Sequence, residues 1–216
     1  MITAGHVFEQ AKAKGLTIAV GLDKGFHALR DCVVSDDRDR HDIGIAKLSD
    51  EAIKRISADR FLTPRDTERR TPSRTGVFAY LGYPGRRTAV IDDVLDMKPV
   101  LFVGYRTPAA PEGLSNFDDS LHVLVSANAT EVTNRDGSPV NFQDWKGATI
   151  SFPSDMHGVS GAGVWEVLDY RLFVRKRPQH NPRLAGVLTG SYPTPPSFRV
   201  TQWPVVTEII CRAFPS

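Results

Sequence analysis

Short apolar runs of strand length, separated by turn-forming residues, are the feature that most constrains the fold of this chain. The 216 residues include 17 glycines and 15 prolines, which favours many turns between short strands. The first run, 16–20, is rich in β-branched residues and ends at Gly21, as a strand would. Strands are predicted at 16–20, 28–34, 42–48, 77–81, 88–95, 100–105, 121–125, 163–168 and 184–189.

Helical patterns are few. Residues 50–56 predict one or two helical turns with Ser49 or Asp50 as N-cap. Only the C-terminus is clearly helical, because apolar residues follow Pro204 at positions 205, 206, 209, 210 and 214. The charged stretch 64–74 and the basic, proline-broken stretch 175–183 are interpreted as loops. The pattern therefore predicts a mainly β chain with a C-terminal helix.

Composition excludes several classes of protein. With 41% hydrophobic and 24% charged residues the chain is an ordinary globular sequence, not a disordered tail, coiled coil or collagen-like fibre. A net charge of +2 is too small to imply a nucleic-acid or membrane partner, and no apolar run approaches the roughly 20 residues of a membrane span. No zinc-type Cys/His spacing or phosphate-binding glycine loop is present, so no metal or cofactor is expected.

The two cysteines, Cys32 and Cys211, are too few for a disulfide framework. They are expected to be free, buried thiols in a reducing compartment. The first residues show neither the basic start nor the apolar core of a signal peptide. A cytoplasmic location follows as the expectation, unless a leader lies upstream.

Three segments carry residue types that suit acyl transfer. They centre on His6, on Asp42 and on Ser160, the last of which stands among glycines. A serine is a weak nucleophile until a histidine removes its proton, and a buried carboxylate fixes the imidazole tautomer and stabilises its charged form. The backbone N–H groups of Gly158 and Ser160 would form an oxyanion hole. His41 and His157 stand next to Asp42 and near Ser160, but neither lies in the context of His6.

The order of these segments resembles that of the trypsin-like serine peptidases. The motifs are Thr3-Ala-Gly-His6, Asp42-Ile-Gly-Ile-Ala46 and Gly158-Val-Ser-Gly-Ala-Gly163. Gly82-Tyr-Pro-Gly85 and Gly186-Val-Leu-Thr-Gly-Ser191 are similar to further stretches of bacterial members. The resemblance covers essentially the whole chain and implies a serine endopeptidase that acts on peptide or protein substrates without a cofactor.

The resemblance also implies an architecture and a substrate site. It implies two antiparallel β-barrels, with a first barrel and linker loop at 1–75, a second barrel at 76–204 and a C-terminal helix at 205–216. Thr189, Gly190 and Ser191 would pair with the substrate backbone. Ser154 would floor the specificity pocket and favour small or apolar side chains, whereas a one-residue shift would place Asp155 there and favour Arg or Lys.

Departures from the family pattern leave alternatives open. Ala162 replaces a glycine, Val159 replaces the aspartate of the secreted enzymes, and only five residues precede His6. The last point predicts a truncated chain with an incomplete first barrel. One alternative is an inactive, peptidase-like module that binds peptides or partners. Another is a nucleic-acid module that uses Arg175, Lys176 and Arg177.

Overall fold

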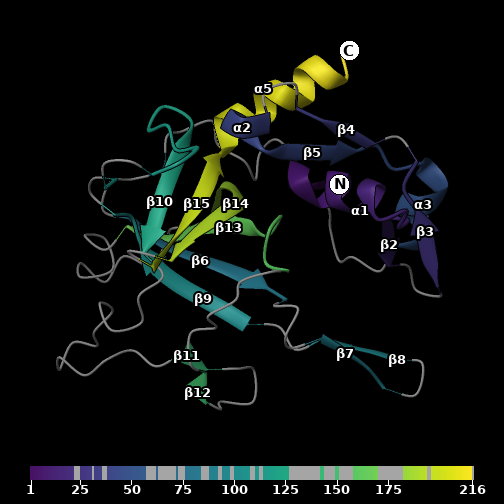
Figure 1. The fold of residues 1–216 in the computed structure, drawn as a ribbon, viewed down its shortest axis with the longest axis horizontal. Helices are drawn as coiled ribbons and strands as arrows, with labels where there is room; N and C mark the ends of the chain where they lie inside the picture. The colour runs from purple at the N-terminus through teal and green to yellow at the C-terminus, as the bar shows by residue number, and fades with distance from the viewer. Residues whose placement is uncertain are drawn as a thin grey trace.

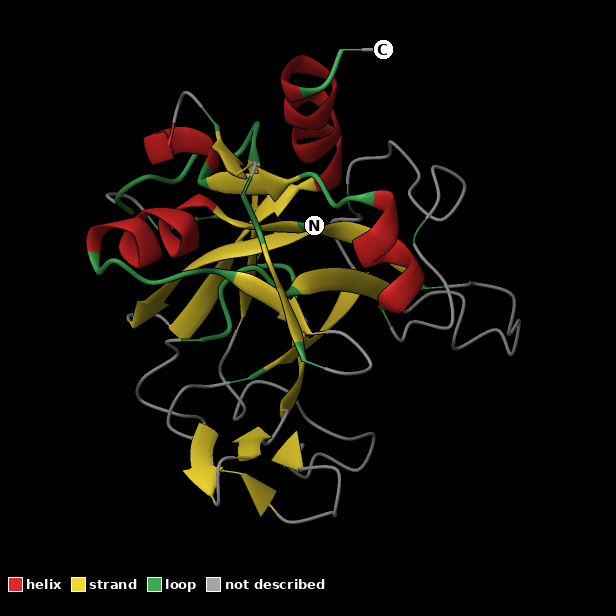
Figure 2. Ribbon diagram, turned by 90° about the vertical axis from the view of Figure 1, so that its right-hand side faces the viewer, coloured by secondary structure: helices red, strands yellow, loops and turns green. Residues whose placement is uncertain are grey.

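The computed structural model shows two larger antiparallel sheets, three two-stranded hairpins and several helices packed beside them (Figure 1). It describes residues 1–21, 25–30, 32–35, 38–56, 62, 72, 76–83, 88–91, 94–97, 100–107, 110–111, 114–126, 142–143, 149–150, 158–169, 182–193 and 196–215. In both ribbon views the helices lie in the upper and middle parts of the molecule, and the short strands 88–91, 94–97, 142–143 and 149–150 lie toward the bottom (Figure 2).

The larger sheet has six strands and curls into a half-barrel, called here the curled sheet. Its order is β10 (His122–Ser126), β15 (Pro196–Gln202), β14 (Arg183–Pro193), β13 (Gly163–Asp169), β6 (Gly76–Gly82) and β9 (Val100–Tyr105). Register shifts in β13 and β14 increase the local twist. The two edge strands approach each other where Arg106 bridges Val125 and the Thr107 N–H donates to the Leu124 carbonyl at 2.8 Å.

The strands of the curled sheet supply the largest apolar core of the described residues. Tyr80 stacks on Phe102 with ring centroids 4.9 Å apart, and Phe198 meets Tyr80 edge-on at 5.0 Å. These rings come from β6, β9 and β15, so the aromatic contacts connect strands near the two opposite edges of the curled sheet. Val159, which precedes Ser160, is 2% exposed and belongs to the same core.

The smaller sheet, called here the small sheet, has the order β1 (Ile2–Ala4), β5 (Ile43–Ala46) and β4 (Cys32–Val34). β1 is an edge strand whose residues Ile2, Thr3 and Ala4 pair with Ile45, Gly44 and Ile43 of β5. Three hairpins complete the described strands: β2 (Ala19–Gly21) with β3 (Phe26–Ala28), β7 (Thr88–Ile91) with β8 (Val94–Met97), and β11 (Phe142–Gln143) with β12 (Thr149–Ile150).

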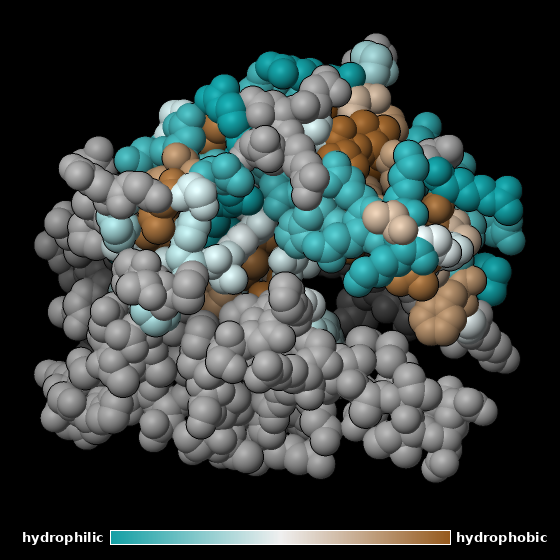
Figure 3. All heavy atoms as spheres, in the orientation of Figure 1, coloured by the Kyte–Doolittle hydropathy of each residue, from teal (hydrophilic) through white to brown (hydrophobic). Residues whose placement is uncertain are grey.

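Four described helices are α1 (Gly5–Ala13), α2 (Arg38–His41), α3 (Asp50–Arg55) and α5 (Trp203–Ala213). Ser49 caps α3 by accepting the Ala52 N–H at 3.2 Å. Helix α5 buries Trp203, Val206 and Ile209 against a second core, to which β5 of the small sheet and β14 of the curled sheet also contribute. Figure 3 shows a hydrophobic patch near this helix among hydrophilic side chains.

The prediction of a mainly β chain with a C-terminal helix is confirmed, and so is the Ser49 cap. The paired-barrel arrangement stays a prediction. The predicted strand 88–95 is wrong, because the segment forms the hairpin β7–β8. Cys32 and Cys211 form no disulfide, and both are exposed rather than buried. No described helix is long and apolar enough to cross a membrane.

Several described elements were not predicted from the sequence, and α1 and β15 illustrate two different reasons. In α1 only Gly5 and Phe8 are buried, so no apolar stripe of helical period exists to be read. β15 carries polar Ser197, Arg199 and Thr201 between apolar Phe198 and Val200, and this alternation is a strand signal that the sequence does contain. The short helix α2 was missed as well.

His122 is the one fully buried histidine of the described residues. The Asp118 N–H donates to its Nδ1 at 3.0 Å, which leaves a proton on Nε2. Burial, with the nearby Arg199 charge, lowers the pKa of His122 from 6.5 to about 4. The folded protein therefore holds this imidazole neutral at pH values where the unfolded chain would protonate it.

We expect the protein to lose stability as pH falls from about 6.5 toward 4. In that window the unfolded chain binds more protons at His122 than the folded chain, so acid favours unfolding by up to about 3 kcal/mol. His122→Asn keeps an acceptor near Nδ1 but cannot titrate, so its loss in the same window should be smaller. Urea unfolding at pH 7, 5.5 and 4.5 measures this. A His27→Asn control should keep the parent's slope, and an equal slope in His122→Asn would contradict the assignment.

Candidate functional site

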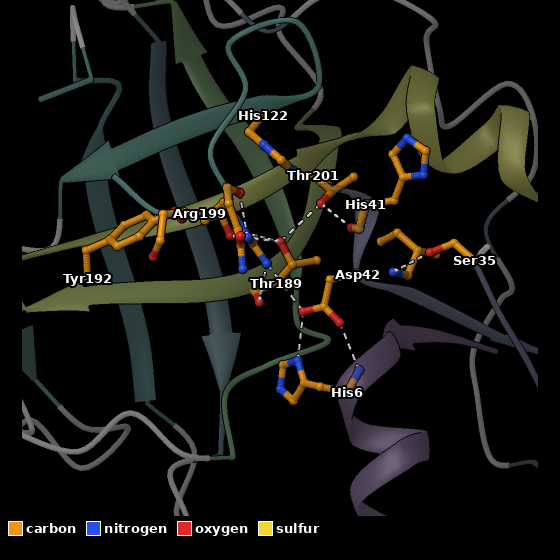
Figure 4. Close-up of polar contacts among 12 residues, drawn as sticks. His6, Ser35, His41, Asp42, His122, Thr189, Tyr192, Arg199 and Thr201 are labelled. Atoms are coloured by element: carbon orange, nitrogen blue, oxygen red, sulfur yellow. Dashed lines mark hydrogen bonds and ion pairs between the residues drawn. The ribbon is translucent and has the colours of Figure 1, made fainter. Parts of the chain in front are cut away.

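His6 and Asp42 lie in direct contact where the small sheet meets helix α1 (Figure 4). The His6 Nδ1 and Asp42 Oδ2 atoms are 2.7 Å apart. Because a carboxylate only accepts, Nδ1 carries the shared proton and the Nε2 lone pair is left free. Asp42 is 5% exposed, whereas the His6 side chain is partly open to solvent. This is the tautomer that a general base needs.

Asp42 also caps helix α1. Ala4 occupies the N-cap position and has no side-chain acceptor for the first helical N–H groups. Asp42 supplies it from another element: its Oδ1 accepts the His6 N–H at 2.8 Å, and its carbonyl accepts the Gly5 N–H at 2.8 Å. Its negative charge also suits the positive end of the helix dipole. One residue therefore fixes both the helix start and the imidazole on it.

A buried polar cluster of Asp42, Thr189, Arg199 and Thr201 surrounds the carboxylate on the side of the curled sheet (Figure 4). Thr189 and Thr201 share a hydrogen bond at 3.0 Å, and Thr201 donates to the His41 carbonyl at 2.8 Å. Arg199 Nη2 lies 3.4 Å from Asp42 Oδ2. Arg199 and Thr201 belong to β15, which was not predicted from the sequence, and neither residue was a sequence candidate for the site.

Ser160 lies in a tight turn between β12 and β13. Gly158 and Gly161 have φ values of 98° and 93°, a left-handed backbone that favours glycine. The Gly161 N–H donates to the Leu188 carbonyl of β14 at 2.8 Å, and Val159 anchors the turn in the main core. The N–H groups of Gly158 and Ser160, the expected oxyanion donors, find no acceptor among the described residues.

The turn also packs against β1, three residues before His6. A Cβ built on Gly161 would lie 2.2 Å from Thr3 Oγ1, so the two backbones approach as closely as a glycine allows. This contact brings the Ser160 turn and the strand leading to His6 to one junction. No hydrogen bond joins Ser160 to His6 among the described residues, and such bonds are often loose without substrate.

Of the remaining sequence candidates, some lie on β14 and others lie outside the described residues. Thr189, Gly190 and Ser191 lie on β14 beside β15, and the Thr189 hydroxyl forms a hydrogen bond with Thr201 within the polar cluster. Ser154, Asp155, His157 and the Arg175, Lys176 and Arg177 group lie outside the described residues. His41 contributes its carbonyl, not its ring, to the cluster. No grouping of three metal-ligating side chains occurs in the part of the chain that the structure describes.

Comparison with known proteins adds no family: no protein-family model matches the chain, and no curated protein does.

We expect Gly161→Ala to destabilise the protein by about 2–5 kcal/mol. The new methyl group would clash with the Thr3 side chain, and alanine is also strained in the left-handed backbone that Gly161 adopts. Gly25→Ala is the matched control, because Gly25 has φ 82° and nothing within 4 Å of the added Cβ, so only about 1 kcal/mol is lost. Denaturant unfolding gives both values, and Thr3→Ala should restore part of the Gly161→Ala loss. Equal losses at the two glycines would mean that the turn does not pack on β1.

Proposed function

We propose that this protein is a serine endopeptidase of the trypsin-like type, with His6, Asp42 and Ser160 as its catalytic residues. The observation that carries the proposal is the 2.7 Å contact between His6 Nδ1 and buried Asp42, which leaves Nε2 free to take a proton. The packing of the Ser160 turn on β1 supports it. The proposal includes the paired-barrel architecture, in which the small sheet belongs to the first barrel and the curled sheet forms the second.

The proposed reaction runs through an acyl-enzyme. Ser160 Oγ attacks the scissile carbonyl while His6 Nε2 takes its proton, and Asp42 stabilises the resulting imidazolium. The N–H groups of Gly158 and Ser160 donate to the oxyanion, and each such donor contributes about 3 kcal/mol. His6 then gives its proton to the leaving amine, and water enters by the reverse steps to release the acid.

We expect a fluorophosphonate probe to label the protein at Ser160. Ser160→Ala should abolish labelling because the nucleophile is gone, and His6→Ala should slow it by about a thousandfold or more because the serine keeps its proton. Asp42→Asn should slow it as well, since the imidazole loses its tautomer. Gel fluorescence and intact mass measure labelling. Ser120→Ala and His27→Ala are the controls, and their rates should match the parent's.

Absence of labelling in folded parent protein would refute the proposal, as would equal labelling of Ser160→Ala. The second candidate is an inactive, peptidase-like module that binds peptides, and Ala162 in place of the family's glycine favours it. Such a module would bind peptides with the same affinity in parent and Ser160→Ala protein and would turn none over at any pH. Isothermal titration with the same peptide library decides between the two.

Substrate choice gives a separate prediction. With uncharged Ser154 at the floor of the pocket, cleavage should follow small or apolar side chains rather than Arg or Lys. Mass spectrometry of a cleaved peptide library measures the preference. Strong cleavage after Arg or Lys would instead assign the floor to Asp155, and Asp155→Ser should then remove that preference.

A further inference from the structure

Arg199 is a buried arginine whose hydrogen bonds all go to the protein itself. It is 7% exposed and belongs to β15 of the curled sheet. Its Nε donates to Thr189 Oγ1 at 3.2 Å, Nη1 to the Asn116 carbonyl at 2.6 Å, and Nη2 to Asp42 Oδ2 at 3.4 Å and to the Thr189 carbonyl at 3.3 Å. All three nitrogens are engaged, so the guanidinium is a structural fork and not a free substrate-binding group.

The two partners on the Nη atoms share an unusual backbone. Among the described residues only Asp42 and Asn116 combine a side chain with positive φ, at 47° and 58°. Non-glycine residues in this region cost free energy and persist only where surrounding contacts hold them. Both are in contact with the same guanidinium. Arg199 is therefore placed to hold two strained turns, one beside β5 and one before β10.

The hydrogen bond from Arg199 to Asp42 involves Oδ2, the same oxygen that contacts His6. Oδ2 accepts from Arg199 Nη2 and from His6 Nδ1, whereas Oδ1 accepts the His6 N–H. With donors from two directions, the carboxylate cannot rotate without breaking a buried hydrogen bond, which is costly. The fork shape of arginine matters here, because an ammonium group could not meet acceptors on three different segments.

We propose that Arg199 is a positioning residue that acts through Asp42: it holds the carboxylate so that Oδ2 faces His6. This inference rests on the proposed function, in which the His6–Asp42 pair is catalytic. The nearby Asp118 carboxylate pairs with Arg40 at 2.9 Å. Arg199 is the arginine that contacts Asp42 in the described structure, at 3.4 Å.

A spectroscopic test needs no activity. In histidine-labelled Ser160→Ala protein, the Nδ1–H proton of His6 should give a downfield NMR signal, assigned by its loss in His6→Gln. Arg199→Gln should shift that signal upfield or broaden it through faster exchange, because the carboxylate is no longer held. Arg212→Gln is the control, since Arg212 is an exposed arginine that pairs with Glu208 on the surface of α5. An unchanged His6 signal in folded Arg199→Gln protein would overturn the proposal.

A labelling test asks whether Arg199 acts through Asp42. Arg199→Gln should slow fluorophosphonate labelling about tenfold in the parent but less than about twofold in Asp42→Asn protein. Equal slowing in both backgrounds would overturn the proposal, because Arg199 would then act on the fold. If Arg199→Gln does not fold, Thr189→Val takes its place: it removes the acceptor of Nε, and about threefold slowing with a shifted His6 signal is expected, whereas no change in either overturns the proposal.

The labelling test and the NMR test distinguish failure of the proposed peptidase function from failure of the positioning role of Arg199. A parent protein that is never labelled refutes the proposed peptidase, while the His6 signal still shows whether Arg199 positions Asp42. A labelled parent whose His6 signal ignores Arg199→Gln refutes the positioning role alone.

Discussion

The Asp42 carboxylate is the group on which the rest of the site depends. Its Oδ1 accepts the His6 N–H at the start of α1 in place of an N-cap side chain, and its Oδ2 holds the imidazole of His6 by Nδ1. A buried carboxylate is costly unless hydrogen bonds replace its lost water, and here Arg199 completes the set of donors. Helix start, histidine tautomer and buried ion pair are thus three consequences of one side chain in one orientation.

The same segment joins the two sheets. Three successive residues each contact the curled sheet or the segment before β10. Arg40 forms an ion pair with Asp118 at 2.9 Å, the His41 carbonyl accepts a hydrogen bond from Thr201 at 2.8 Å, and Asp42 pairs with Arg199 at 3.4 Å. Hydrogen bonds to Ser120 and to Arg40 lower the pKa of Asp118 to about 2, so its charge persists at any ordinary pH. An apolar core shared by β5, β14 and α5 lies beside these bonds. Polar contacts fix the register of the junction, while the apolar core supplies most of the burial.

Sequence patterns found most strands and the C-terminal helix, because these elements bury one face and therefore repeat apolar residues at a fixed period. They did not find α1, which buries little besides Phe8 and takes its cap from a residue 36 positions away. They also did not include β15, although its alternation was present, and they gave no sign that Arg199 and Thr201 are buried, because an alternating polar residue predicts a solvent-facing side chain. A polar residue becomes a core residue only when partners from distant segments satisfy it.

The sequence by itself determined the residue types of the candidate site and their order, His6, Asp42 and Ser160, together with a mainly β fold. It did so because local chemistry, glycine turns and apolar periodicity are properties of neighbouring residues. Only the tertiary structure decided that Asp42 meets His6 through Nδ1, that the Ser160 turn packs on Thr3, and that Arg199 holds the carboxylate from 157 residues away. Contacts across such distances depend on how the two sheets dock, and docking is set by the summed burial and hydrogen bonding of many segments rather than by any one of them.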